Sequence, residues 1–177
     1  FAYYSFVRTD THYYLGYFYY WPKRWSTFPV FPRVYENATR GVMLVVRVGE
    51  PGTYGTLEAM ITTTEGNYDY CVTDGGSLVA DSTEAQQIIK TDASSGHARP
   101  VVFADEQTHD IRCVRDWQQN GFPGDNGIVY RWGYSATTPD PLIDENARYS
   151  LISLVEDLWP DRNDIGDARL FDSFGHF

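Results

Sequence analysis

Lysine is scarce in this chain, because 12 of its 14 basic residues are arginine and only Lys23 and Lys90 are lysine. Aspartate and glutamate together number 24, so the formal net charge is −10. Nonspecific affinity for nucleic acid comes from clustered Lys and Arg that displace counterions from phosphates. The charge therefore argues against a nucleic-acid partner. No apolar run approaches the roughly 20 residues that a membrane-spanning helix needs, so no membrane span is expected.

Motifs of the common catalytic and nucleotide-binding sites are also missing. The sequence has no GxSxG elbow, no P-loop and no dinucleotide-binding glycine pattern, which argues against acyl transfer and nucleotide binding. Its four histidines fall in different segments, without the HxH or HExxH spacing that puts two imidazoles on one metal. His12 and His109 each stand at the start of an expected strand, where either a functional or a hydrogen-bonded structural role is open.

Cysteine occurs only twice, as Cys71 and Cys113, and neither lies in a CxxC or His-Cys cluster typical of zinc sites. A disulfide that closes a large loop is favoured, with two buried free thiols as the alternative. The triplet Asn37-Ala38-Thr39 is an N-glycosylation sequon in a polar stretch, where an acceptor loop is expected. Together the two features favour a secreted or cell-surface glycoprotein.

The 177 residues, 42% of them hydrophobic, suit one globular domain that spans residues 1–177. Strand-like runs separated by turn residues predict a mainly β fold. The expected strands lie near residues 2–8, 12–20, 42–48, 56–63, 67–72, 99–105, 109–114 and 127–132. The proline-rich stretch from Trp21 to Gly41 is interpreted as an extended connection across the surface.

Two helices are expected within this β framework. Thr83 followed by Gln86 fits a capping box that opens a short helix toward Ile89 in a mid-chain insertion. Apolar residues at three- and four-residue spacing predict a second helix over residues 145–157, before Trp159-Pro160. The expected fold class is an antiparallel β-sandwich with one C-terminal helix and this short mid-chain helix.

An oxygen-rich loop follows the expected C-terminal helix. Asp161, Asn163, Asp164 and Asp167 bring three carboxylates and an amide into seven residues, and such loops can bind Ca²⁺. The loop does not match the EF-hand pattern, because the terminal bidentate Glu is missing and Asp172 would have to supply that ligand. The alternative is a turn in which Asp and Asn side chains cap backbone amides. No cofactor is expected from the sequence unless this loop binds Ca²⁺.

Aromatic residues are concentrated at the N-terminal end, where the first 35 residues hold 15 of the 29. A two-sided strand cannot bury every one of these rings within a small domain. Exposed Tyr and Trp anchor protein interfaces and stack on sugar rings. We therefore expect Tyr19, Trp21 and Trp25 to contribute to a contact between copies of the chain or with a glycan.

A resemblance to a known group covers most of the chain. The segments that carry it are TDTHYYLGYFYYWPKRW, YENATRGVMLVVR, YGTLEAMITT, ARPVVFADEQTHDI and LWPDRNDIGDARLFDSFGHF. They resemble an uncharacterised group of microbial secreted proteins, which is distantly similar to the Vps62-like and necrosis-inducing-protein β-sandwiches. The resemblance implies a secreted β-sandwich.

The chain departs from this group before its central strand. The group reads His-Glu-Asn-Asp-x-Glu-Gly there, whereas this chain has Tyr35, Ala38 and Arg40 in place of the histidine and two of the acidic residues. A site for a divalent cation or proton transfer would keep only Glu36 and the amide of Asn37. The resemblance thus implies that any activity at this place is lost.

Three functions follow from these observations. The first is a non-enzymatic extracellular protein that self-associates in a surface layer or filament as a homo-oligomer. The second is a lectin-like, carbohydrate-binding module. The third is a hydrolase with a degenerate site, in which His12, Glu36 and His109 hold a divalent metal ion.

Overall fold

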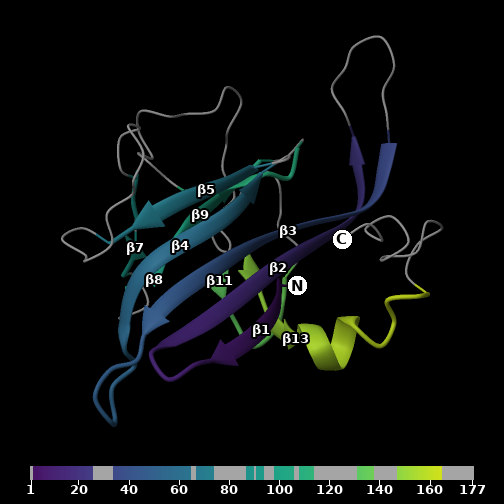
Figure 1. Cartoon of the computed structure of the whole chain (residues 1–177). Coiled ribbons are helices and arrows are strands. Elements are labelled where there is room, and N and C mark those ends of the chain that lie inside the picture. The colour runs from purple at the N-terminus through teal and green to yellow at the C-terminus, as the bar shows by residue number, and fades with distance from the viewer. Residues whose placement is uncertain are drawn as a thin grey trace.

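The chain is built around one seven-stranded mixed sheet (Figure 1). The computed structural model describes residues 2–25, 34–64, 67–73, 87–89, 91–93, 98–105, 108–113, 131–137 and 147–164. The strand order is β13-β1-β2-β3-β4-β5-β6. These strands are β1 (Ala2–Arg8), β2 (His12–Trp25), β3 (Val34–Arg47), β4 (Thr56–Thr64), β5 (Asn67–Val72), β6 (Gln87–Ile88) and β13 (Leu151–Ser153).

The first five strands form an antiparallel meander, and β13 and β6 add to its two sides in parallel orientation. Hairpin connections explain the meander, because consecutive antiparallel strands need only a short turn. The expected strands at residues 2–8, 56–63 and 67–72 match β1, β4 and β5 closely. The prediction of a mainly β fold is confirmed.

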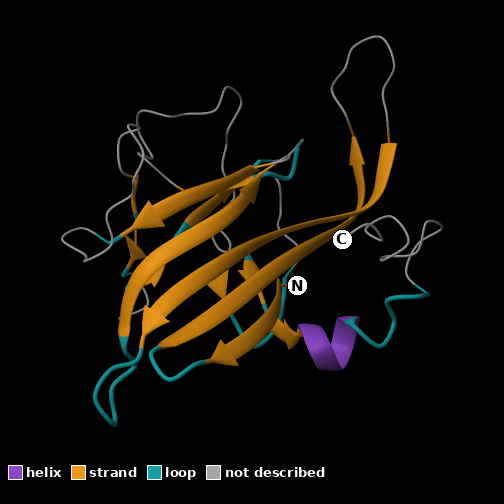
Figure 2. Cartoon of the chain, viewed as in Figure 1, coloured by secondary structure: helices purple, strands orange, loops and turns teal. Residues whose placement is uncertain are grey.

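In the described part of the chain, three pairs of short strands accompany the large sheet (Figure 2). They are β7 (Thr91–Asp92) with β8 (Arg99–Pro100), β9 (Val102–Ala104) with β10 (Ile111–Cys113), and β11 (Arg131–Trp132) with β12 (Arg148–Tyr149). Strand β10 contacts β3, β4 and β5, so the β9–β10 hairpin covers part of one face of the large sheet. A sandwich of two full sheets is not confirmed in the described part of the chain.

The expectation of a surface connection between residues 21 and 41 is wrong for the described residues. Residues 21–25 continue β2 and residues 34–41 begin β3, and the ladder extends to the pair Trp25↔Val34. The register skips Pro22, whose ring nitrogen has no hydrogen to donate. Aromatic and β-branched residues on both sides of this proline favour the extended backbone, so one proline does not end the strand. Residues 26–33 lie outside the described residues.

The helix predicted over residues 145–157 is much shorter in the structure, where it is limited to residues 154–158. Residues 148–149 form β12 and residues 151–153 form β13, and one π-helical turn, η1 (Leu154–Leu158), follows. Ala2 pairs with Leu151 in the ladder between β1 and β13, so pairing with a distant strand overrides the helical spacing of the apolar residues. The turn is capped by Ser153, whose side chain accepts a hydrogen bond from the backbone N–H of Glu156.

The mid-chain helix toward Ile89 is not found where the structure describes that segment. Gln87 and Ile88 form β6, which pairs in parallel with Cys71 and Val72. Ile89 is buried in the core, and its backbone N–H donates to the Val72 carbonyl. Burial beside β5 therefore decides the local structure, and residues 83–86 lie outside the described residues.

The core lies on the face of the large sheet that β10 covers. Alternate residues of each strand point to this face, as the period of two requires. Its buried members are Val42, Leu44, Val46, Met60, Cys71, Ile89, Ile111 and Cys113. A disulfide joins Cys71 on β5 to Cys113 on β10, with 6.4 Å between the two Cα atoms. The predicted disulfide is thus present and ties the hairpin to the sheet.

The opposite face of β2 carries the alternate aromatic residues. Gly16 and Gly41 lie beneath the ring of Phe18. A Cβ atom built at either glycine would stand 3.1 Å or less from that ring, and at Gly16 it would also stand within this distance of the Ser5 side chain. Phe18 therefore packs on the backbone of its own sheet.

No helix in the described part of the chain is long and apolar enough to cross a membrane.

Candidate functional site

A cavity of about 370 Å³ lies between the core face of the large sheet and the short strands β8, β9 and β12. Its floor is aliphatic and consists of Val42, Leu44 and Met60 from β3 and β4. Val102 and Leu151 close its sides. The volume is near the lower end of the range for small-molecule sites, which are mostly apolar with a few polar groups.

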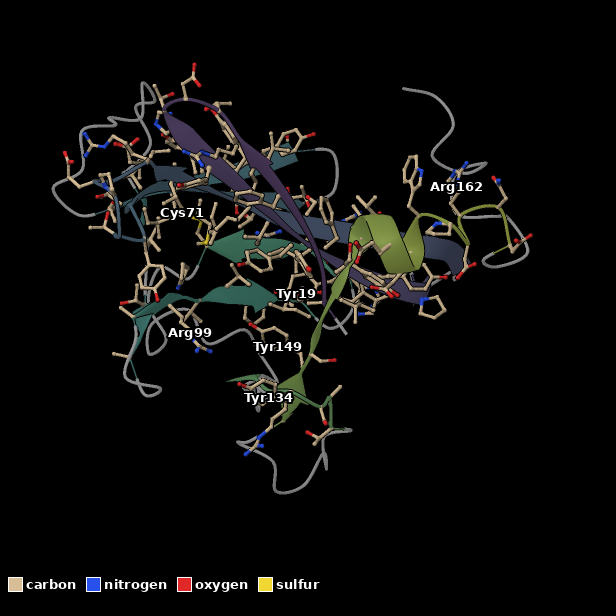
Figure 3. All side chains as sticks on the ribbon, turned by 90° about the horizontal axis from the view of Figure 1, so that it is seen from below. Tyr19, Cys71, Arg99, Tyr134, Tyr149 and Arg162 are labelled. Atoms are coloured by element: carbon tan, nitrogen blue, oxygen red, sulfur yellow. A yellow bond between two sulfur atoms is a disulfide. The ribbon has the colours of Figure 1, made fainter. Side chains whose placement is uncertain are left out.

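The polar groups of this cavity come from three tyrosines and one arginine. Tyr17 and Tyr19 stand two residues apart on β2, so both point to the core face. Tyr149 enters from β12 and Arg99 from β8. Figure 3 shows Tyr19, Tyr149 and Arg99 in the same region beneath the large sheet. We call this site the tyrosine cavity.

Burial keeps the tyrosines of the cavity neutral. It raises the pKa of Tyr17, Tyr19 and Tyr149 above the ordinary value of 10.0, because a phenolate would lose its hydration. The neighbouring tyrosines raise the pKa of Tyr19 further. The positive charge of Arg99 opposes part of the effect on Tyr17 and Tyr149. Near neutral pH the cavity therefore offers three phenol O–H groups and one permanent cation.

A second polar cluster surrounds the turn before β10. The indole ring of Trp21 stacks on the imidazole ring of His109, with centroids 4.4 Å apart. His109 has a φ of 57°, in the left-handed region that non-glycine residues rarely adopt. Next to it, the buried Asp110 pairs with Arg40 at 3.4 Å and with Arg112 at 3.3 Å. Both charges of the Arg40–Asp110 pair are largely buried, and the cluster places the turn against the paired residues of β2 and β3.

A third cluster centres on Glu58, which lies at the β-bulge between β3 and β4. Its buried carboxylate contacts His12 Nε2 at 3.0 Å and Arg47 Nε at 3.0 Å. His12 Nδ1 lies 2.9 Å from the Thr11 hydroxyl. The contacts join three neighbouring strands, and Arg47 also borders a depression of about 500 Å³ at the β3–β4 turn. Most residues that line this depression are exposed, so it is a less favourable binding site than the tyrosine cavity.

The structure separates the residues proposed for a metal site. His12 stands at the start of β2, whereas His109 stacks on Trp21, nine positions along the same strand. At about 3.3 Å per residue the two histidines are roughly 30 Å apart, so one ion cannot bind both. Glu36 pairs with Lys23 in the β2–β3 ladder, and its side chain lies outside the described residues. The described residues hold no group of three or more His, Cys, Asp or Glu side chains that could bind a metal.

The other predicted site residues fall in different places. Asn37 lies within β3 rather than in the expected loop. Asp161, Asn163 and Asp164 are exposed in the turns after η1, where the backbone N–H of Asp164 donates to the carbonyl of Asp161. Asp167 and Asp172 lie outside the described residues. Arg162 lies over the ring of Trp159, 5.0 Å from its centroid, and donates to the Trp159 carbonyl.

Two of the three predicted interface residues pack against the core. Tyr19 and Trp21 are partly buried on the core face of β2. The backbone of Trp25 ends β2, and its side chain lies outside the described residues. These placements give Tyr19 and Trp21 a role within the domain.

Sequence reasoning missed Arg99 and Tyr149 as site residues. Arg99 comes before Pro100 at the start of an expected strand, and Tyr149 stands two residues before Leu151 in a run that also fits alternation. The alternation of Tyr149 and Leu151 was the one signal of a strand there. The same residues also fit a helical spacing, which led to the prediction of a helix. Comparison of the chain with protein-family models, with curated proteins and with solved structures finds no match.

Proposed function

We propose that this protein is a non-enzymatic binding protein that holds a small ligand in the tyrosine cavity. One observation carries the proposal: three neutral phenols and one guanidinium converge over an aliphatic floor in a partly enclosed space of about 370 Å³. An apolar concave surface with a few converging polar groups is the usual form of a ligand site.

The chemistry of the cavity supports binding rather than catalysis. A general base works best with a pKa near the operating pH, whereas burial raises the pKa of these tyrosines further from neutrality. Arginine side chains stay protonated in proteins, so they do not act as general bases. Among the described residues that line the cavity, none is a carboxylate, histidine or cysteine. The groups present can donate hydrogen bonds and hold a ligand in place.

The two methionines provide a direct test. Met60 lines the cavity and is fully buried, whereas Met43 alternates with Val42 and Leu44 and so points to the opposite face of β3. We expect a ligand from a panel of small metabolites and glycans to shift the ¹³C-methyl resonance of Met60 and to leave that of Met43 unchanged. The Leu151→Trp variant, which fills the cavity, should lose the shift. Ligands that move neither resonance would contradict the proposal, whereas binding by extended glycans alone would favour the lectin-like alternative.

Self-association is a second candidate function. The exposed residues of β1, rather than the aromatic residues of β2, support it. Residues 5–8 of β1 form ladder pairs only with β2 in the described part of the chain, and η1 also contacts β1. The part of this edge that η1 leaves uncovered can accept a strand. Phe6 and Val7 on this segment are 55% and 58% exposed. Two copies could join β1 to β1 and bury both side chains.

A size measurement tests the self-association proposal. We expect the native protein to show a concentration-dependent mass in sedimentation analysis, and Phe6→Lys to shift it toward the monomer. Tyr54→Lys, at a 96% exposed side chain away from β1, is the control. A wild-type protein that stays monomeric at high concentration would contradict the assembly.

We also propose that the protein is secreted and glycosylated. The Cys71–Cys113 disulfide is consistent with an extracellular location, because disulfides persist in oxidising compartments. We propose that Asn37 carries an N-linked glycan in a host that recognises the sequon. Mass spectrometry of the peptide that covers residues 34–40 tests this, and an unmodified mass in all molecules would contradict it.

A further inference from the structure

We propose that the ligand of the tyrosine cavity is a small apolar carboxylate, which consists of a ring or short hydrocarbon chain and one carboxylate group. This inference rests on the proposed binding function and names the ligand class for the same site. Three features of the cavity carry it: its charge, its hydrogen-bond donors and its floor.

The charge of the cavity is opposite to that of the whole chain. The chain has a net charge of −10, yet the one charged group among the described lining residues is the guanidinium of Arg99. Arginine has five N–H donors in a planar arrangement that matches a carboxylate, so it can bind a ligand while it keeps a contact within the protein. A cation that is partly removed from water attracts an anion more strongly than the same cation on the surface.

The tyrosines supply further donors to the same anion. Tyr17 and Tyr149 line the same cavity as Arg99, and the charge of Arg99 opposes the rise in the pKa of both tyrosines. A neutral phenol donates its proton to a carboxylate oxygen in a short, charge-assisted hydrogen bond. Arg99, Tyr17 and Tyr149 therefore form a clamp for one carboxylate group.

The floor selects the rest of the ligand. Val42, Leu44 and Met60 offer no polar partner, so the hydroxyl groups of a sugar would lose water there without compensation. A hydrocarbon chain or aromatic ring gains free energy on the same surface. The volume of about 370 Å³ accepts one small molecule and excludes a polysaccharide. Floor and clamp together favour an apolar monocarboxylate over a neutral sugar.

A matched pair of probes tests the ligand class. 4-Phenylbutyrate carries the carboxylate, and 4-phenylbutyramide has nearly the same shape without the charge. Isothermal titration calorimetry should show the carboxylate binding roughly 10- to 100-fold more tightly than the amide, as expected for a hydrogen bond to a charged group. Arg99→Gln should remove this preference and Tyr149→Phe should reduce it, whereas Arg162→Gln, at the arginine that lies on Trp159, should not change it.

The outcomes separate the ligand class from the binding function. Equal affinity for both probes, or an unchanged preference in Arg99→Gln, would overturn the carboxylate inference. If the Met60 methyl resonance still shifts in that case, the proposed function stands. If neither probe nor any member of the wider panel binds, both proposals fail.

Discussion

The indole ring of Trp21 lies nearly parallel to the imidazole ring of His109, with 7° between the two planes. This contact joins the far part of β2 to the turn before β10, across 88 positions of the sequence. Stacked aromatic rings stabilise a fold beyond the area that they bury. Trp21 therefore has a structural role within the domain, because it connects the β2–β3 hairpin to the turn before β10.

We expect Trp21→Ala to lower the free energy of unfolding by about 3 kcal/mol, toward the low end for a large aromatic truncation because the ring is only partly buried. Urea denaturation measures this change. Trp159→Ala is the control, since Trp159 is 46% exposed and should cost less. A Trp21 variant with native stability and reduced self-association would instead support the interface interpretation of this residue.

The tyrosine cavity predicts loss of stability at alkaline pH. Burial raises the folded-state pKa of Tyr19 above 10.0, so above pH 10 the unfolded chain releases a proton that the folded chain retains. The stabilising contribution is thus complete below pH 10 and falls as the pH rises toward the folded-state pKa. For one tyrosine the loss approaches about 1.4 kcal/mol per pH unit.

Tyr19→Phe should reduce this alkaline slope, because phenylalanine has no proton to lose. Thermal unfolding at pH 8 and pH 11 gives the comparison, with Tyr54→Phe as the control at an exposed position. Both cysteines are in the disulfide, so thiol exchange does not start from a free cysteine. An equal slope in wild type and Tyr19→Phe would show that Tyr19 titrates normally.

Local pattern was sufficient for the strands whose partners are adjacent in sequence. Residues 56–63 and 67–72 alternate or carry β-branched side chains between clear turns, and both form strands of the meander. The lengths of β2 and β3 were not predictable in the same way. Pro22 indicated that the strand ends before it, but pairing with residues 34–41 extends β2 past this proline.

The candidate site could not be predicted from sequence, because distant segments assemble it. Arg99 and Tyr149 stand on strands of two residues each, which have no period of their own. Leu151 fits a helical spacing as well as a strand, and only its pairing with Ala2 on β1 decides between them. The disulfide was predictable because the chain has only two cysteines, so their partner choice needed no knowledge of the fold.

Loss of the disulfide should cost about 4 kcal/mol of unfolding free energy, as the chain-entropy relation gives for a sequence separation of 42 residues. The Cys71→Ala/Cys113→Ala double variant removes the link without leaving a free thiol. We expect a lower denaturation midpoint, measured against the oxidised wild type in urea. A midpoint within experimental error of the wild type would mean that packing of β10 on β4 and β5 holds the hairpin without the covalent link.

The last prediction concerns Thr62, whose side chain is fully buried on β4 and whose hydroxyl has no hydrogen-bond partner among the described residues. Burial of a hydroxyl group without a partner costs roughly 1–3 kcal/mol, and valine has nearly the same shape without the polar oxygen. Thr62→Val should therefore raise the free energy of unfolding by about 1 kcal/mol. Thr63→Val is the matched control and should be destabilising, because the Thr63 hydroxyl accepts a hydrogen bond from the Gly41 backbone N–H at 2.8 Å. If Thr62→Val lowers stability as much as Thr63→Val does, the Thr62 hydroxyl has a partner in solution, such as a bound water molecule.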